Sequence, residues 1–288
     1  MSPSRKPVII VIHGAWHRPV HYINIYNFFR SLDYIVRIPA LPSAGHDECV
    51  PQKGTDDDVK QVRSVMKEYT DRGMRIVVVC HSYGGFPATD AVYGETVSDR
   101  EARGEQGGVA AIVYLAAFAP PAAGMSLLSV ATENGEKDIP DWWAKKGGHV
   151  LLQPHAMENL YSGIPEELAR MNLISTVPQS LKSFENNAVR AAAEIAAPKT
   201  YIAAEGDLAI PFEGQKGMAL AAGAKLEVIP GSHSPFSDPE IRKPRGQHCL
   251  TRQVKLAELL LNWIEAEARY TFDQRKVREP VKMNFLRL

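Results

Sequence analysis

The chain has 288 residues, 45% of them hydrophobic, which is enough for one large domain or a domain that carries an insertion. Its 33 basic and 33 acidic side chains balance, so it lacks the basic excess that nucleic-acid binding requires. The three cysteines are too few for a disulfide framework or a metal site, and a reducing, cytoplasmic location fits them best. A neutral small-molecule substrate is compatible with this composition.

The first apolar run, residues 8–12, is too short for a signal peptide or a membrane span and indicates a buried strand. It ends in His13, Gly14, Ala15 and Trp16. A strand that breaks at His-Gly ahead of a helix is a frequent way to build an oxyanion hole, because the glycine lets a backbone N–H swing toward the nucleophile. A plain strand-to-helix turn is the alternative.

A second strand is predicted at residues 34–40, and a helix at residues 55–72, where apolar residues recur at helical spacing. The helix begins with three consecutive aspartates, Asp56, Asp57 and Asp58. Carboxylates complement the positive end of a helix dipole, so a solvated helix start is favoured over a cation site.

Residues 75–86, R-I-V-V-V-C-H-S-Y-G-G-F, have the layout of a nucleophile elbow. Residues 76–79 form a β-branched run typical of a strand buried on both faces, and the small residues after it allow a sharp turn that exposes Ser82. Cys80 replaces the usual first glycine and is expected to be buried and inert, and His81 is expected to be structural. An ordinary strand followed by a glycine turn is the alternative.

Further strands are predicted at residues 110–118, 199–204 and 225–229, and helices at residues 83–93, 213–222 and 251–269, with a surface loop at 98–108. Because strands and helices alternate, the fold class is α/β, with a mostly parallel, doubly wound sheet. The predicted core comprises residues 1–119 and 198–269, followed by a tail at 270–288. The role of the tail stays open, and with it the choice between a monomer and a homodimer.

Residues 120–197 interrupt this alternation with short amphipathic pieces and no strong strand, which indicates a helical cap inserted over the carboxyl edge of the sheet. Trp142, Trp143, Tyr161 and Phe184 are the cap side chains that we expect to line a substrate pocket. The alternative is that they only pack the cap against the core.

Acyl transfer at neutral pH needs a nucleophile, a base and an acid that orients the base. Ser82, Asp207 and His233 follow three predicted strands in the chain order Ser, Asp, His that α/β-hydrolases use. Glu205 is an alternative acid, and His233 could instead be an ordinary loop histidine.

Residues 13–16, 80–85, 158–161, 206–211 and 231–236 together resemble the α/β-hydrolase superfamily, specifically the branch with plant methylesterases, hydroxynitrile lyases and related fungal hydrolases. The resemblance spans about residues 8–265. It implies Ser82 as nucleophile, His233 as base and Asp207 as acid. It also implies an oxyanion hole formed by backbone N–H groups of Ala15 or Trp16 together with Tyr83.

Lyases of this branch have a lysine after the catalytic histidine and a threonine on the first strand, where this chain has Ser234 and Ile10. Without that cation a leaving cyanide is not stabilised, so the lyase reaction is disfavoured. The sequence therefore predicts a serine hydrolase of a carboxylic ester or lactone, without metal or cofactor. A non-hydrolytic reaction on the same scaffold and a small-molecule receptor are the alternatives.

Overall fold

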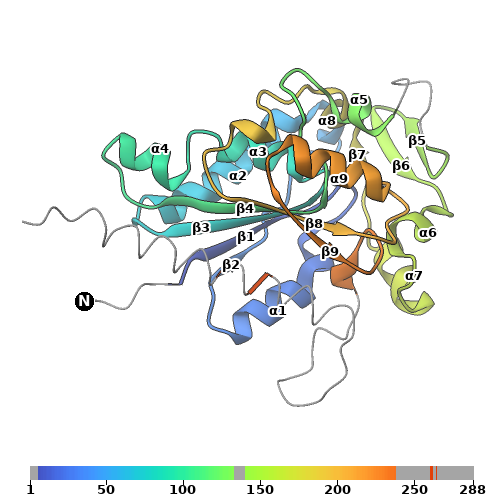
Figure 1. Ribbon diagram of the computed structural model, residues 1–288. Helices are drawn as coiled ribbons and strands as arrows, with labels where there is room; N and C mark the ends of the chain where they lie inside the picture. Colours follow the sequence, from blue (N-terminus) through green and yellow to red (C-terminus); the bar gives the residue numbers. More distant parts are fainter. Residues whose placement is uncertain (1–5, 133–139, 238–259, 262–263, 265–288) are drawn as a thin grey trace, which may run out of the picture.

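The computed structural model describes residues 6–132, 140–237, 260, 261 and 264, and a six-stranded sheet forms its centre (Figure 1). The strands lie in the order β2-β1-β3-β4-β8-β9, and every neighbouring pair is parallel. Their bounds are Val8–Ile12 (β1), Val36–Arg37 (β2), Arg75–Ser82 (β3), Gly108–Ala117 (β4), Lys199–Ala204 (β8) and Lys225–Ile229 (β9). The predicted α/β fold with a parallel sheet is confirmed.

Helices cover both faces of this sheet because its strands are apolar on both faces. In β1, Ile10 packs into one core cluster with α2 and α3, whereas Ile9 packs into a second cluster with α1. The helices between the strands are Ile23–Ser31 (α1), Thr55–Thr70 (α2), Gly85–Val92 (α3), Val97–Ala102 (α4) and Phe212–Ala221 (α9). Short 3-10 helices occupy Pro19–Tyr22, Val50–Gln52, Ala192–Glu194 and Pro235–Ser237.

The region expected to be a surface loop at 98–108 is in part helical, which corrects that prediction. Helix α4 begins after Thr96, whose hydroxyl accepts the N–H of Asp99, while the Asp99 carboxylate accepts the N–H of Thr96. This reciprocal capping box stabilises a helix start despite the charged composition. Most of the predicted helix at 251–269, the tail and Cys249 lie outside the described residues.

Residues 120–197 lie between β4 and β8 in the chain, and the helices and strands described within 127–185 lie at the carboxyl ends of the parallel strands (Figure 1). Their helices are Leu127–Ala131 (α5), Ala156–Tyr161 (α6), Glu166–Ile174 (α7) and Leu181–Glu185 (α8). They also form an antiparallel sheet that the sequence analysis did not predict, comprising Trp143–Lys146 (β5), His149–Leu152 (β6) and Gln179–Ser180 (β7). Gly147 and Gly148 join β5 to β6 with φ angles of 58° and 77°, as a two-residue hairpin turn requires.

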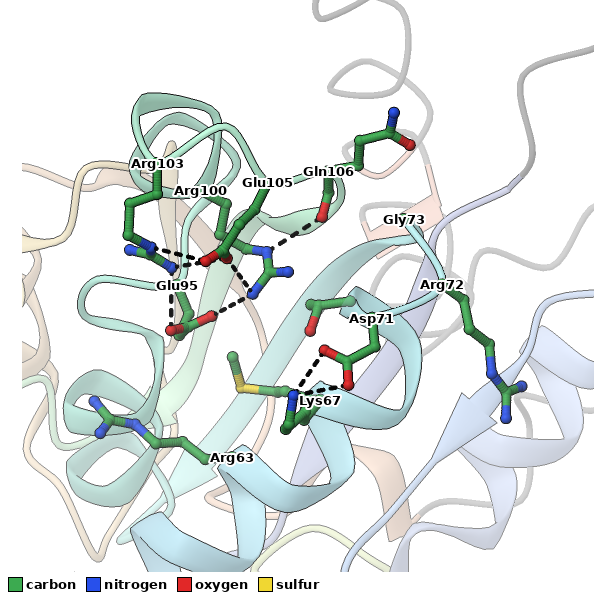
Figure 2. Close-up of a pocket in the computed structure, with 12 residues that line it drawn as sticks. Arg63, Lys67, Asp71, Arg72, Gly73, Glu95, Arg100, Arg103, Glu105 and Gln106 are labelled. Carbon is green, nitrogen blue, oxygen red and sulfur yellow. Dashed lines mark hydrogen bonds and ion pairs between the residues drawn. The ribbon is translucent and has the colours of Figure 1, made fainter.

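At the opposite end of the strands, their amino-terminal end, the residues before β3 and β4 border a hollow of about 970 Å³ (Figure 2). Figure 2 shows ion pairs along its wall: Arg100 lies 2.9 Å from Glu95 and 3.0 Å from Glu105, and Arg103 lies 3.3 Å from each. The guanidinium and carboxylate groups of this wall therefore largely neutralise one another.

Candidate active site

Ser82 lies at the turn between β3 and α3, in a conformation that non-glycine residues rarely adopt. Its φ angle is 51°, and the residue is 7% exposed. The turn is tight because glycines follow it: a Cβ on Gly84 would lie 2.6 Å from the carbonyl oxygen of His13, and one on Gly85 would clash with that of Phe118. This is the strand–turn–helix geometry that the sequence predicts for residues 75–86.

A buried histidine–carboxylate pair lies at the ends of β8 and β9. His233 Nδ1 is 2.9 Å from Asp207 Oδ2, and both side chains are at most 2% exposed. The other carboxylate oxygen, Oδ1, accepts the backbone N–H groups of Ala209 and Ile210 at 2.8 and 2.9 Å. Because Gln215 Nε2 also donates to Oδ2, at 3.2 Å, the carboxylate is held in one orientation toward His233.

The alternative acid, Glu205, is exposed and makes no hydrogen bond or ion pair with His233 among the described residues. Nor does any hydrogen bond join Ser82 Oγ to His233 Nε2 in the part of the chain that the structure describes. In ligand-free structures such bonds are often long and tighten only when substrate binds.

His81 joins three segments around the turn at Ser82. His81 Nε2 lies 2.8 Å from the carbonyl oxygen of His233, which can only accept, so Nε2 carries the ring proton. Because burial lowers the pKa of His81 and keeps the ring neutral, its Nδ1 accepts the Tyr22 hydroxyl at 2.8 Å, and Tyr22 Oη accepts the backbone N–H of Gly14 at 2.8 Å. His81 thus connects the loop after β1 with the loop that carries His233.

The loop after β1 packs directly against the turn at Ser82. A Cβ on Gly14 would lie 2.8 Å from His81 Nδ1 and 2.9 Å from Ser82 Cβ, so the approach needs glycine. The N–H groups of Ala15 and Tyr83 have no acceptor among the described residues. Both N–H groups belong to segments in contact with the Ser82 turn.

Trp16, the other residue predicted for this loop, differs from Ala15. Its backbone has φ 61°, and its N–H donates to Gln179 Oε1 at 3.3 Å. Its indole donates to the carbonyl oxygen of Val150 at 2.8 Å. Both contacts come from the small antiparallel sheet, so the N–H of Trp16 is already committed to residues of the 120–197 segment.

Three of the four predicted substrate-binding residues surround the Trp16 indole. The ring centroids of Trp142, Trp143 and Phe184 lie 5.6, 6.3 and 5.6 Å from it, and Phe184 also stacks on Tyr83 at 5.9 Å. All of these rings are at most 9% exposed. They form an apolar cluster between the Ser82 turn and the small sheet.

Tyr161, the fourth, lies against the loop after β1 through His17. The Nδ1 proton of His17 goes to the carbonyl oxygen of Ala15 at 2.8 Å, so its Nε2 accepts the Tyr161 hydroxyl proton at 2.9 Å. Burial lowers the pKa of His17, and it lowers the pKa of His13 to about 4. These rings are therefore neutral at pH 7.

Asp58 corrects the prediction of a solvated helix start and is the main residue that sequence analysis missed. Its carboxylate is fully buried and accepts hydrogen bonds from the Ser43 hydroxyl and the Tyr83 hydroxyl, both at 2.5 Å. Burial raises the pKa of this carboxyl to about 6, although these hydrogen bonds oppose the rise. Asp57, by contrast, caps the helix by accepting the N–H of Gly54, which lowers its pKa.

Neither a metal site nor a membrane helix is found in the described ranges. Within residues 6–132 and 140–237, no three histidine, cysteine, aspartate or glutamate side chains cluster so that they could hold a metal ion. No helix in this part of the chain is both long and apolar enough to cross a membrane.

The parallel sheet, the strained serine after β3 and the buried pair after β8 and β9 together define an α/β-hydrolase fold. Residues 9–241 match the model of the alpha/beta hydrolase family, and the chain belongs to that family. It is 27% identical over 240 residues to the alpha/beta hydrolase nvfD of Aspergillus novofumigatus, covering 82% of this chain and 93% of that protein. It is 26% identical over 242 residues to the probable hydrolase R7 of a Phoma species, covering 82% and 94%.

Solved structures with the same fold include esterases. A pyrethroid hydrolase from Sphingobium faniae superposes with a TM-score of 0.70 at 18% identity, covering 92% of this chain and 99% of that one. Polyneuridine aldehyde esterase gives 0.69 at 17% identity, and the methylesterase MES16 from Arabidopsis gives 0.65 at 17%, each covering 90% and 99%. The predicted resemblance to plant methylesterases and fungal hydrolases is confirmed, and the family supports hydrolysis as the general activity.

Proposed function

We propose that this protein is a serine hydrolase that cleaves a carboxylic ester or lactone of a small, hydrophobic metabolite. The observation that carries the proposal is the buried hydrogen bond of 2.9 Å between His233 Nδ1 and Asp207 Oδ2, beside the strained turn at Ser82. Because the carboxylate accepts the Nδ1 proton, it leaves Nε2 as a base. A nucleophile, a base and an orienting acid are the groups that acyl transfer needs.

In the mechanism, His233 Nε2 takes the Ser82 hydroxyl proton while Oγ attacks the carbonyl carbon, and the imidazolium then protonates the leaving alcohol. Water, deprotonated by the same nitrogen, releases the acid from the acyl-enzyme. The oxyanion accepts the N–H groups of Ala15 and Tyr83, which have no other acceptor among the described residues. Each donor contributes on the order of 3 kcal/mol to transition-state stabilisation.

Of the two loop N–H groups that the sequence left open, that of Ala15 is the proposed oxyanion donor, because the Trp16 N–H donates to Gln179. The rings of Trp142, Trp143 and Phe184 would contact the apolar part of the substrate next to Tyr83, with Tyr161 on the His17 side.

The test is the intact mass of the protein after exposure to a fluorophosphonate, together with p-nitrophenyl acetate hydrolysis, for wild type, Ser82→Ala and Cys80→Ala. We expect one adduct on wild type and on Cys80→Ala, since the Cys80 thiol is buried and donates to the Val113 carbonyl oxygen. Ser82→Ala should form no adduct and lose at least roughly 10³-fold in kcat. An adduct on folded Ser82→Ala, or undiminished turnover, would overturn the proposal.

A second candidate is a non-hydrolytic reaction in which His233 moves protons and Ser82 only positions the substrate. It is favoured by the lack of a Ser82–His233 hydrogen bond among the described residues. Folded wild-type protein that forms no adduct and hydrolyses no ester would favour this reaction or a receptor role.

A further inference from the structure

Gln179, at the start of β7, sits in a buried polar network between the small sheet and the core. The residue has no exposed surface. Its side-chain oxygen accepts the backbone N–H of Trp16 at 3.3 Å, and its amide nitrogen donates to Ser43 Oγ at 2.8 Å and to Ser183 Oγ at 2.7 Å. No sequence motif pointed to this side chain.

The donor and the acceptor of each hydrogen bond in this network can be assigned. Ser43 gives its hydroxyl proton to Asp58 at 2.5 Å, and Ser183 gives its own to the Ser180 carbonyl oxygen at 2.7 Å. Both hydroxyls must therefore accept from Gln179, so the amide nitrogen faces them and the amide oxygen faces Trp16. The orientation of the Gln179 amide is therefore fixed by Asp58 through Ser43 and by the Ser180 carbonyl through Ser183.

The network ends on both sides of the proposed oxyanion hole. At one end Gln179 holds Trp16, the residue after Ala15, and the Trp16 carbonyl oxygen also accepts the Val177 N–H at 2.9 Å. At the other end the Tyr83 hydroxyl donates to Asp58 at 2.5 Å. A non-glycine residue with φ 61° has a strained backbone and persists only where its surroundings hold it.

We propose that Gln179 is a positioning residue for ester hydrolysis: through Trp16 it holds the Ala15 N–H at the distance from the Tyr83 N–H that the oxyanion requires. This inference rests on the proposed function. Gln179 lies in the segment between β4 and β8, yet it sets the position of N–H donors, those of Ala15 and Tyr83, that belong to the core. The energetic reason is that a displacement of about 1 Å in such donors can cost roughly 100-fold in rate.

The test compares Gln179→Leu with Ser183→Ala. Leucine has a similar size but accepts nothing from Trp16, whereas Ser183→Ala removes a neighbouring bond and leaves Trp16, Gln179 and Ser43 connected. For p-nitrophenyl acetate we expect Gln179→Leu to lower kcat roughly 10- to 100-fold with KM within about threefold of wild type. The rate of fluorophosphonate labelling should fall in parallel, and Ser183→Ala should stay within about twofold in both assays.

Hydrogen–deuterium exchange supplies a readout that needs no turnover. The peptide containing residues 14–17 should exchange faster in Gln179→Leu than in wild type or Ser183→Ala. Unchanged kcat in folded Gln179→Leu, with or without faster exchange, would overturn the proposal, and so would a lower kcat with unchanged exchange. Wild-type labelling that is lost in Ser82→Ala would still support the proposed function in those cases.

If Gln179→Leu does not fold, Tyr83→Phe tests the same network from its other end. It removes only the hydroxyl that donates to Asp58 and leaves the Tyr83 N–H in the chain. We expect kcat to fall about 5- to 10-fold with KM unchanged. Wild-type kcat in Tyr83→Phe would overturn the proposal.

Discussion

The two ends of the central sheet hold their charged groups in opposite ways. At the carboxyl end, Asp58 is fully buried, and its carboxylate accepts hydrogen bonds from the N–H and hydroxyl of Ser43 and from the hydroxyl of Tyr83. At the amino end, Glu105 pairs with Arg100 and Arg103 while 43% of its side chain is exposed (Figure 2). Exposed pairs are worth about 0–1 kcal/mol and tolerate rearrangement, whereas buried polar groups are costly when one partner is lost.

This difference separates the large hollow from the candidate active site. The hollow holds more charge, but its described residues include no nucleophile next to a base. The site around Ser82 has few charges, and each of them orients a particular donor. Chemistry is thus proposed at the end of the sheet where a few buried groups are precisely oriented, and not at the end with more charge and the larger hollow.

The largest expected effect is that of Asp207→Asn. Asparagine can still accept the backbone N–H groups of Ala209 and Ile210 through one oxygen, but its amide nitrogen would face His233 Nδ1 and favour the wrong tautomer. We expect kcat for p-nitrophenyl acetate to fall by roughly 10⁴-fold in a folded protein. The matched control is Glu205→Gln, which should keep wild-type kcat, and a greater loss there than in Asp207→Asn would assign the acid to Glu205.

A drop in pH from 7 to 4 should destabilise the protein by several kcal/mol. Burial lowers the pKa of His13 to about 4 and also lowers the pKa values of His17 and His81. Between pH 6.5 and 4 the unfolded chain therefore binds more protons, so stability is present above pH 6.5 and is lost as the pH falls, by about 3 kcal/mol for His13 alone.

Asp58 acts in the opposite direction, because its raised pKa lets the folded state bind a proton first between about pH 6 and 4. One carboxyl does not offset several histidines. Urea unfolding at pH 7 and pH 4 measures the net effect, and equal unfolding free energies at the two pH values would contradict the assignment of neutral buried imidazoles.

The most direct comparison replaces one carboxylate by alanine at each end of the sheet. Asp58→Ala leaves the N–H and hydroxyl of Ser43 and the hydroxyl of Tyr83 without their acceptor, so we expect a loss of about 3 kcal/mol or more in unfolding free energy. Glu105→Ala leaves Arg100 paired with Glu95 and should lower the unfolding free energy far less than Asp58→Ala does. Urea unfolding at pH 7.5 measures both losses of unfolding free energy. Equal losses in the two variants would contradict the distinction between the two ends of the sheet.

The sequence predicts the parts of the site that depend on local pattern. Ser82, Asp207 and His233 each follow a β-branched or apolar run, and parallel strands bring their carboxyl ends to one edge of the sheet. The close packing of Gly14 on Ser82 follows from the same topology. The hairpin turn at residues 147–148 carried a local signal, two adjacent glycines, that the sequence analysis overlooked.

The network of Asp58 and Gln179 could not be predicted in this way. Gln179 is 136 residues from Ser43 and 163 from Trp16, so no spacing in the sequence joins them. Asp58 sits beside Asp56 and Asp57, which are ordinary helix-start carboxylates, and it differs from them because Ser43 and Tyr83 pack against it and donate hydrogen bonds to it. Burial of this kind depends on how the elements meet, not on local composition.

The arrangement around Trp16 also has an optical consequence. Three of the chain's four tryptophans, Trp16, Trp142 and Trp143, lie with ring centroids 5.6 to 6.4 Å apart and with tilted planes. Chromophores at this separation couple electronically and exchange excitation energy, so their near-ultraviolet dichroism and emission belong to the group and not to single rings. The protein thus carries an unlabelled spectroscopic reporter at the junction where the small sheet meets the loop after β1.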